Sequence, residues 1–245
     1  MSLETEIAAL TSTGKALIDT FNGKKAGIDA ALAAAVAAAP AISRTFYVDQ
    51  DLGVDTAAGT VDAPLKTINQ AFANTPGGGT VDIILVKDYV LDSVISASNR
   101  GIVIRGDTVG GNVRKLTLRD FPTGTGTKRM GGFQVGRRVS ITFADLTLAL
   151  PDTAGLALPL DNFYALLYAG GNSIPPFLPF NLYNVAFTLA GTFAGKLVGP
   201  GINSLAFVAI ASTIPTALEG SLITGVAAGK DPNTVPWLIT NVTKL

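Results

Sequence analysis

The 245-residue chain contains no cysteine and no histidine. Without cysteine, disulfides, thiolate nucleophiles and thiolate metal sites are excluded. Without histidine, the chain lacks the commonest general base and metal ligand at neutral pH. Tryptophan occurs once, at Trp237, so broad aromatic rings on which sugars stack are scarce. Any chemistry must therefore depend on carboxylates and basic side chains.

Charged residues are also scarce, at 15% of the chain, and 18 basic and 18 acidic side chains give a formal net charge of zero. A neutral chain lacks the basic excess that binding to nucleic acid or to a membrane surface requires. Hydrophobic residues make up 48% of the chain, and the mean hydropathy is +0.41. Because a soluble monomer needs a more charged surface, we expect the chain either to enter a membrane or to associate with copies of itself.

The uncharged stretches of the chain are too interrupted to be transmembrane helices. No charge occurs between Asp161 and Lys196, but prolines, glycines and asparagines break that stretch. The second uncharged window, 197–218, is broken in the same way. Glu4 and Glu6 stand where a signal peptide has basic residues. We therefore expect neither membrane insertion nor a signal peptide, and self-association is the better explanation.

Residues 1–39 are predicted to form a helix with an apolar seam. Apolar residues recur at alternating spacings of four and three, the heptad pattern that lets helices supercoil. After Ile28 the apolar positions shift to Leu32 and Val36, and Pro40 is expected to end the helix. The seam residues are Leu3, Ile7, Leu10, Leu17, Phe21 and Ile28. This pattern favours an oligomeric coiled coil over a single amphipathic helix that packs on its own domain.

Residues 46–79 are expected to form a junction, and residues 80–245 a β-rich body. In the junction, Phe46–Asp49 predicts a short strand, and Pro64–Phe72 has one apolar face at helical spacing. In the body, short alternating apolar runs separated by turn residues predict strands. These strands are expected at 81–86, 101–107, 115–119, 139–143, 146–148, 182–189, 205–210, 221–226 and 238–242.

The spacing between the predicted strands favours a solenoid. Ile83 and Ile102 are 19 residues apart, and Leu205, Leu222 and Leu238 follow one another at 17 and 16 residues. Repeats of this size match one turn of a solenoid that has three short strands per turn. An ordinary β-sandwich gives similar strand spacing and is the alternative.

Several short motifs occur together in the junction. They are Phe46-Tyr47-Val48-Asp49, a Gly/Asp-rich loop, Ala63-Pro64-Leu65-Lys66-Thr67-Ile68, Gln70-Ala71 and Gly79-Thr80-Val81. Their combination resembles the opening of pectin-lyase-like right-handed parallel β-helices, in which a capping helix closes the hydrophobic end of the solenoid. The segment Met1–Leu10 is similar to the start of bacteriophage tail fibre and tailspike proteins. Together the resemblances cover about residues 1–107, and no family motif is found beyond about residue 110.

The resemblance implies a homotrimeric virion protein with a helical stem, residues 1–45, and a β-helical body. The stem would attach to the phage tail or baseplate, and the body would meet the host surface. Residues 151–245 carry seven charges, and packing against symmetric copies would shield this apolar part. The chain stops at 242–245, still strand-like and without a visible cap. Expected partners are copies of the chain, other tail or baseplate proteins and host surface polysaccharide, but not nucleic acid.

Many tailspikes of this fold class cut surface polysaccharide, so catalysis must be weighed. Glycoside hydrolysis uses two carboxylates about 5–10 Å apart. Asp88, Asp92 and Asp107 are the candidates, because Asp88 and Asp92 are close in sequence and Asp107 would stack near Asp88 one coil later. Aspartate beside turns is common for hydrogen-bonding its own backbone, which favours a non-catalytic role. The sequence shows no cluster of carboxylates of the kind that binds calcium, so no metal and no cofactor are expected.

Basic residues are concentrated between Arg100 and Arg138, where nine cations accompany Asp107 and Asp120. Because arginine binds phosphate through a planar fork, this segment suits the phosphates of a lipopolysaccharide core. It equally suits an acidic neighbour in the virion, or a solvated face without a ligand. Four residues that flank Gly131-Gly132 are expected to be the exposed members: Lys128, Arg129, Arg137 and Arg138.

The sequence therefore leaves three functions open. The favoured one is a phage tail fibre or tailspike in the virion that attaches to the tail and recognises host glycan or lipopolysaccharide. The first alternative is a tailspike that cleaves polysaccharide. The second is an internal baseplate or collar component that does not contact the host.

Overall fold

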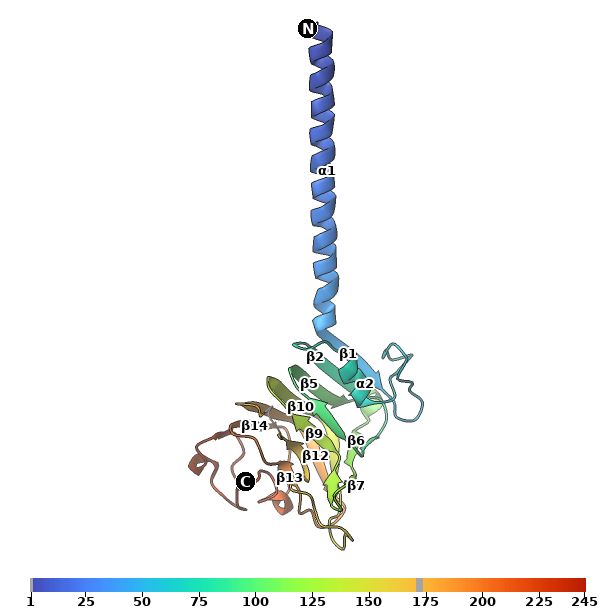
Figure 1. Cartoon of the computed structure of the whole chain (residues 1–245). Coiled ribbons are helices and arrows are strands. Elements are labelled where there is room, and N and C mark those ends of the chain that lie inside the picture. Colours follow the sequence, from blue (N-terminus) through green and yellow to red (C-terminus); the bar gives the residue numbers. More distant parts are fainter. Residues whose placement is uncertain (1, 171–173) are drawn as a thin grey trace. The chain divides into compact units, whose positions relative to one another are not determined.

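The computed structural model describes residues 2–170 and 174–245 and is mainly β, with one long N-terminal helix (Figure 1). The chain divides into two compact units, Met1–Ile42 and Ser43–Leu245. The coarse fold class that the sequence predicted, a β-rich chain with a helical N-terminus, is confirmed. The first strand begins at Ser43, so residues 43–45, which we expected to end the stem, belong to the second unit.

Helix α1 (Leu3–Ile42) makes up the first unit. It extends two residues beyond Pro40, where we expected it to end, and helix limits commonly differ by this much. The six seam residues are between 56% and 74% exposed in the single chain. Three interior glycines, Gly14, Gly23 and Gly27, each weaken a helix by about 1 kcal/mol relative to alanine. Most helical stability in proteins comes from packing of an apolar face, and here that face is uncovered.

The second unit is built from parallel sheets, so it does not fit the antiparallel sandwich considered above. Within the described residues, nine strands form the largest sheet. Two of them, β3 (Tyr89–Leu91) and β6 (Arg114–Leu118), extend it beside the second half of β10. The other seven follow one another across it in the order β1 (Ser43–Val48), β2 (Thr80–Leu85), β5 (Arg100–Gly106), β10 (Val139–Leu150), β12 (Leu178–Leu189), β14 (Leu205–Ile210) and β15 (Leu238–Thr240).

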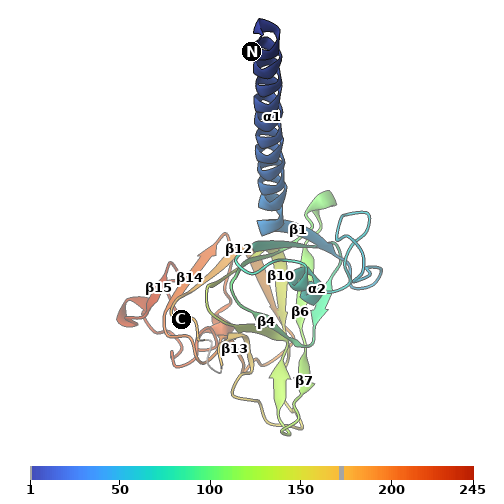
Figure 2. The same cartoon turned by 45° about the horizontal axis from the view of Figure 1, so that its top comes forward.

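A second parallel sheet lies across the core from the first. Within the described residues it contains, in spatial order, β13 (Lys196–Val198), β11 (Ala165–Tyr168), β9 (Gly132–Val135) and β4 (Val94–Ala97). Figure 2 shows β4 and β13 opposite β10 and β12. Between β6 and β9 the chain makes an antiparallel hairpin, β7 (Asp120–Pro122) and β8 (Lys128–Met130), which projects away from the sheets (Figures 1 and 2).

The pairing differs from the repeat that the sequence suggested. Ile83 pairs with Ile104 rather than lying opposite Ile102, and Leu205 pairs directly with Leu238. The expected repeat through Leu222 is therefore wrong. Segment 221–226 forms no strand, and only Ile223 makes an isolated bridge, to the second sheet. The number of residues between successive paired strands varies, and apolar spacing alone cannot show which sheet a short run joins.

A column of aromatic rings runs through the core. Centroids of successive rings are 6.2, 6.0, 6.1 and 5.1 Å apart. The rings belong to Phe72, Phe133, Phe143, Phe180 and Phe207, from α2 (Ile68–Ala73), β9, β10, β12 and β14. Because each ring contacts the ring of a neighbouring element, the column links both sheets and the short helix into one core.

Helix α2 begins later than expected. The sequence placed its start at Pro64, but the N-cap is Thr67, whose Oγ1 accepts a hydrogen bond from the Gln70 amide at 3.1 Å. The preceding Leu65 instead bridges Val48 of β1. Threonine satisfies an otherwise unpaired amide at a helix start, so the capping residue, and not the proline, sets the boundary.

The C-terminal end is folded back, so the expectation of an uncapped, strand-like end is wrong. β15 ends at Thr240, and Leu245 is buried. The Leu245 carbonyl accepts a hydrogen bond from the Gly229 amide at 2.7 Å, and its amide donates to the Lys230 carbonyl at 3.3 Å. The 3₁₀ turns η2 (Thr216–Leu218) and η3 (Pro232–Thr234) precede it, while η1 (Val109–Gly111) follows β5.

Strands β10, β12 and β14 bend or end at stacked residues in the left-handed conformation. These residues are Asp145, Asn184 and Ala211, with φ of 51°, 51° and 50°. Asn184 Nδ2 donates a hydrogen bond to Asp145 Oδ1 at 2.9 Å. The bend at Asp145 lies within one strand, where the sequence predicted two. Aspartate and asparagine tolerate this conformation, whereas alanine does not, so Ala211 is strained.

We expect Ala211→Asn to raise the free energy of unfolding by about 1 kcal/mol, because asparagine adopts positive φ at lower cost than alanine. Thermal unfolding followed by circular dichroism measures the change. Ala190→Asn is the matched control, since Ala190 is exposed but is not among the positive-φ residues. Equal melting temperatures for the two variants would contradict strain at Ala211.

Candidate functional site: a basic groove beside a clamped hairpin

The nine cations of segment 100–138 do not form one free surface. Five make side-chain contacts within the fold: Arg100 with the Thr75 carbonyl, Arg105 with Asp82, Arg114 with Asp107, Lys128 with Asp120 and Arg129 with Asp161. Lys128 and Arg129 were expected to be exposed, but both are half-buried. That expectation is wrong because their partners could not be matched from the sequence, least of all Asp161, which lies 32 residues from Arg129.

The other four cations lack a side-chain hydrogen bond or ion pair among the described residues. Arg137 and Arg138 are exposed in the turn before β10. Lys115 and Arg119 are exposed on β6 and just beyond its end. The structure therefore does not bring the four predicted binding residues together as one free set. Lys115 and Arg119, which we had not singled out, line a cavity.

The basic groove lies on the outer face of β6, β10 and β12 and has a volume of about 390 Å³. Its lining includes Lys115, Thr117, Arg119, Asp120, Ala149 and Thr188. Leu116 and Leu118 point into the core, so the alternating residues of β6 face outward. At a rise of about 3.3 Å per residue, the Cα atoms of Lys115 and Arg119 are at most about 13 Å apart, since Arg119 lies just beyond the end of β6. The groove is thus lined by two basic side chains together with alanine and threonine residues.

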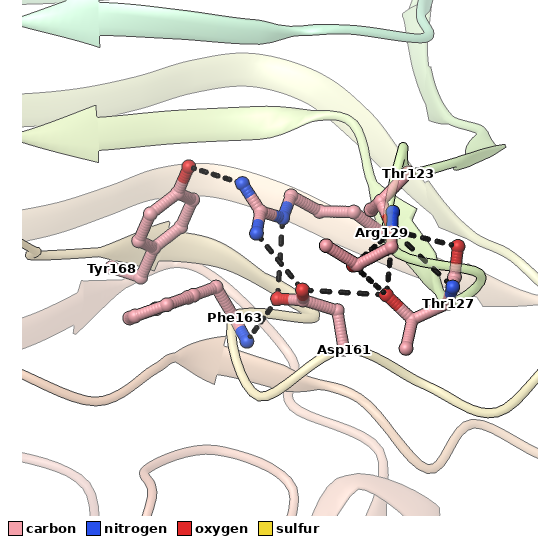
Figure 3. Close-up of polar contacts among 7 residues, drawn as sticks. Thr123, Thr127, Arg129, Asp161, Phe163 and Tyr168 are labelled. Carbon is pink, nitrogen blue, oxygen red and sulfur yellow. Dashed lines mark hydrogen bonds and ion pairs between the residues drawn. The ribbon is translucent and has the colours of Figure 1, made fainter.

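The hairpin beside this groove is fixed by a clamp of Thr127, Arg129, Asp161, Phe163 and Tyr168 (Figure 3). Arg129 Nε and Nη2 donate to the Asp161 carboxylate at 3.2 and 2.9 Å, and Nη1 donates to Tyr168 Oη at 3.4 Å. The guanidinium carbon lies 5.4 and 5.6 Å from the ring centroids of Phe163 and Tyr168. The clamp therefore joins β8 to β11 and to the segment that precedes it.

Hydrogen bonds hold Asp161 in its ionised form. Burial opposes ionisation, but hydrogen bonds from the Arg129 guanidinium and the Phe163 amide, the latter at 2.7 Å, outweigh it, and the pKa of Asp161 lies below its ordinary value. Burial raises the pKa of the Tyr168 phenol, although Arg129 acts in the opposite direction. At neutral pH, the clamp is therefore a charge-assisted contact between ionised partners.

We expect Asp161→Asn to lower the free energy of unfolding at pH 7 by about 1–2 kcal/mol, because it leaves the half-buried Arg129 without its counter-ion. The pKa of Asp161 is lower in the folded chain, so its stabilisation is present above the unfolded value of about 3.9. That stabilisation disappears as the pH falls through the folded pKa. Urea unfolding at pH 7 and at about pH 3 should show the difference between wild type and variant shrinking. Asp62→Asn, at an exposed position, is the control, and a pH-independent difference would contradict the clamp.

Two of the three aspartates considered for catalysis hold the backbone. Asp88 Oδ1 accepts a hydrogen bond from the Lys115 amide at 2.9 Å. Asp107 Oδ1 accepts one from the Val109 amide at 2.9 Å, and its Oδ2 lies 3.6 Å from Arg114 Nη2. Both carboxylates contact the short segment 114–115, Asp88 at the Lys115 amide and Asp107 at the Arg114 guanidinium.

The third aspartate, Asp92, lines a different cavity, of about 480 Å³, together with Asp55 and Tyr89. Asp55 is already engaged there, because its carboxylate accepts hydrogen bonds from the Lys66 and Thr67 amides at 3.0 and 2.8 Å. Within residues 2–170 and 174–245, no group of three acidic side chains is arranged to hold a metal ion. The structure thus does not gather Asp88, Asp92 and Asp107 in one cavity.

The chain matches no protein-family model, no curated protein and no solved structure. In the part of the chain that the structure describes, no helix is both long and apolar enough to cross a bilayer. The features of the chain that bear on its function are the parallel sheets, the exposed seam of α1 and the basic groove.

Proposed function

We propose that this chain is a homotrimeric phage tail fibre or tailspike protein whose body is a right-handed parallel β-helix. Three stacks of parallel strands support the β-helix: β2, β5, β10, β12 and β14; then β3 and β6 with the second halves of β10 and β12; then β4, β9, β11 and β13. The chain visits these stacks in turn, as a solenoid does. Crossovers between parallel strands are right-handed in nearly all proteins.

The exposed seam of α1 is the observation that most supports the proposed trimer. Six large apolar side chains at heptad spacing have no cover in the single chain, and two further copies supply that cover. Helix α1 ends at Ile42 and β1 begins at Ser43, so no linker separates the stem from the body. The stem would trimerise and attach to the tail or baseplate, while the body reaches the host surface.

The basic groove is the proposed contact with the host. Lys115 and Arg119 offer two cations that have no ion-pair partner in the described part of the chain along an open groove, and Asp120 at its edge is neutralised by Lys128. This arrangement fits an extended chain with anionic groups, such as a phosphorylated surface polysaccharide, more closely than a compact ligand. Three copies would present three equivalent grooves, and avidity would strengthen a weak single contact.

Binding of the full chain to purified phosphorylated lipopolysaccharide tests this proposal. We expect Lys115→Glu with Arg119→Glu to weaken binding at least tenfold, since each lost charge contact contributes about 1 kcal/mol or more. Arg137→Glu with Arg138→Glu makes the same change in net charge outside the groove and is expected to alter binding less than twofold. Biolayer interferometry at two salt concentrations measures both.

The same experiment separates the three functions. Equal losses for the two double variants would assign binding to overall charge and contradict a role for the groove. An absence of wild-type binding to lipopolysaccharide and to host cells would favour an internal baseplate or collar component. Shortening of the polysaccharide, abolished by Asp92→Asn, would favour the depolymerase.

A further inference from the structure

The outer face of the largest sheet carries less charge at its C-terminal strands than at its N-terminal strands. At β2 and β5 its outer face carries an ion pair, in which Arg105 Nε and Nη2 donate to Asp82 at 2.9 and 2.8 Å. At β10 and β12 it carries an uncharged polar pair, in which Asn181 Nδ2 donates to Thr142 Oγ1 at 3.2 Å, and one carboxylate, Asp145, which accepts a hydrogen bond from Asn184. Strands β12, β14 and β15 contain no charged residue. The outer face therefore loses its charge toward the C-terminal strands.

The outward residues of β12 before its bend, together with those of β14 and β15, form what we call the neutral face: Pro179, Asn181, Tyr183, Ala206, Val208, Ile210 and Ile239. Register places Tyr183 beside Ile210, and Ala206 between Pro179 and Ile239. The three strands lie next to one another in Figure 2. In the single chain Tyr183, Ile210 and Ile239 are 40%, 47% and 67% exposed. Clustered exposed apolar side chains on a sheet face mark an interaction surface.

We propose that the neutral face packs against the same face of other copies around the axis of the assembly, an inference that rests on the proposed trimer. Identical surfaces that meet near a symmetry axis place like residues close together. A charged face would repel its copies there, whereas a face without charge does not. If the partner were a different protein, it could carry charges opposite to those of this chain, and charged residues would be tolerated on this face. A different partner would therefore not explain why the face has no charge.

The stem strengthens this contact. Once three stems are joined, the bodies are held at a high effective concentration, on the order of millimolar for a short connection. A patch that is too small to hold separate bodies together is then sufficient to keep joined bodies in contact. Stem and neutral face thus form two separate contacts in one assembly, and each can be tested by itself.

Thiol labelling tests the neutral face directly, because the chain contains no native cysteine. Ile210→Cys and Ile239→Cys each introduce one thiol on the face. Val61→Cys and Val109→Cys introduce one at loop positions that are 61% and 76% exposed, and these are the controls. In the full-length assembly, we expect a maleimide to react at least tenfold more slowly at the two face positions than at the controls. Mild oxidation should give covalent dimers for Ile239→Cys and none for Val109→Cys.

The mass of each variant, measured in the same samples, separates the two proposals. Equal labelling rates in an assembly of trimeric mass would overturn the neutral face as an interface and leave the stem trimer standing. A monomeric mass for the wild-type chain would overturn the trimer, and the contact between copies with it. Slow labelling at both face positions in a trimer supports the inference.

Discussion

Replacement of Phe180 by alanine should lower the free energy of unfolding by about 3–5 kcal/mol. Phe180 is fully buried, and its ring centroid lies 6.1 Å from that of Phe143 and 5.1 Å from that of Phe207. The variant would leave a cavity between the rings of Phe143 and Phe207, which the paired strands β10, β12 and β14 cannot close without losing their register. For a unit of this size, the melting temperature should fall by about 10 °C.

Phe177→Ala is the matched control for this change. Phe177 lies just before β12 and is 44% exposed, so the same truncation should change stability by less than about 0.5 kcal/mol. Thermal unfolding of both variants by circular dichroism gives the comparison. If the Phe180→Ala protein had the same melting temperature as the wild type, the aromatic column would not be what holds the strands together.

The double variant Leu10→Asp with Leu17→Asp should reduce the mass of the particle to that of a single chain. Both leucines lie on the heptad seam and are at least 70% exposed in the single chain. In a trimeric coil their side chains would be buried at its axis. At each of the two positions, the three helices would place three aspartate charges together in the buried centre of the coiled coil, which is energetically very unfavourable. Analytical ultracentrifugation measures the mass.

Ala9→Asp with Ala16→Asp controls for the effect of aspartate on the helix itself. These residues precede the two leucines by one position and lie off the seam. The same number of aspartates is thus added to the same turns, and we expect the assembly to persist. Dissociation of both variants would point to loss of helix rather than loss of a specific seam.

The sequence predicted the elements whose patterns are long or regular. The heptad spacing of α1 and the alternation in β2, β5 and β14 gave elements within a few residues of those observed. The short strands β3, β4, β9, β11 and β13 were missed, because three or four residues carry too little periodicity. β11 shows why: all four of its residues are buried, so it has no alternation at all.

The candidate site was harder to predict than the fold. Nine cations close in sequence look alike until their acidic partners are known, and Asp161 and Asp82 come from other segments of the chain. For this reason Arg129 was expected at the surface and Lys115 was passed over. Parallel pairing brings residues that are distant in sequence together, so which cations have an acidic partner can be identified only when the strand register is known.

Sedimentation equilibrium of the full-length chain over a range of concentrations tests the central claim most directly. In the proposed trimer, other copies cover the exposed seam of α1 and the neutral face, so the particle should have three times the 25.1 kDa chain mass at every concentration measured. A soluble particle of 25.1 kDa that does not associate at tens of micromolar would contradict the account.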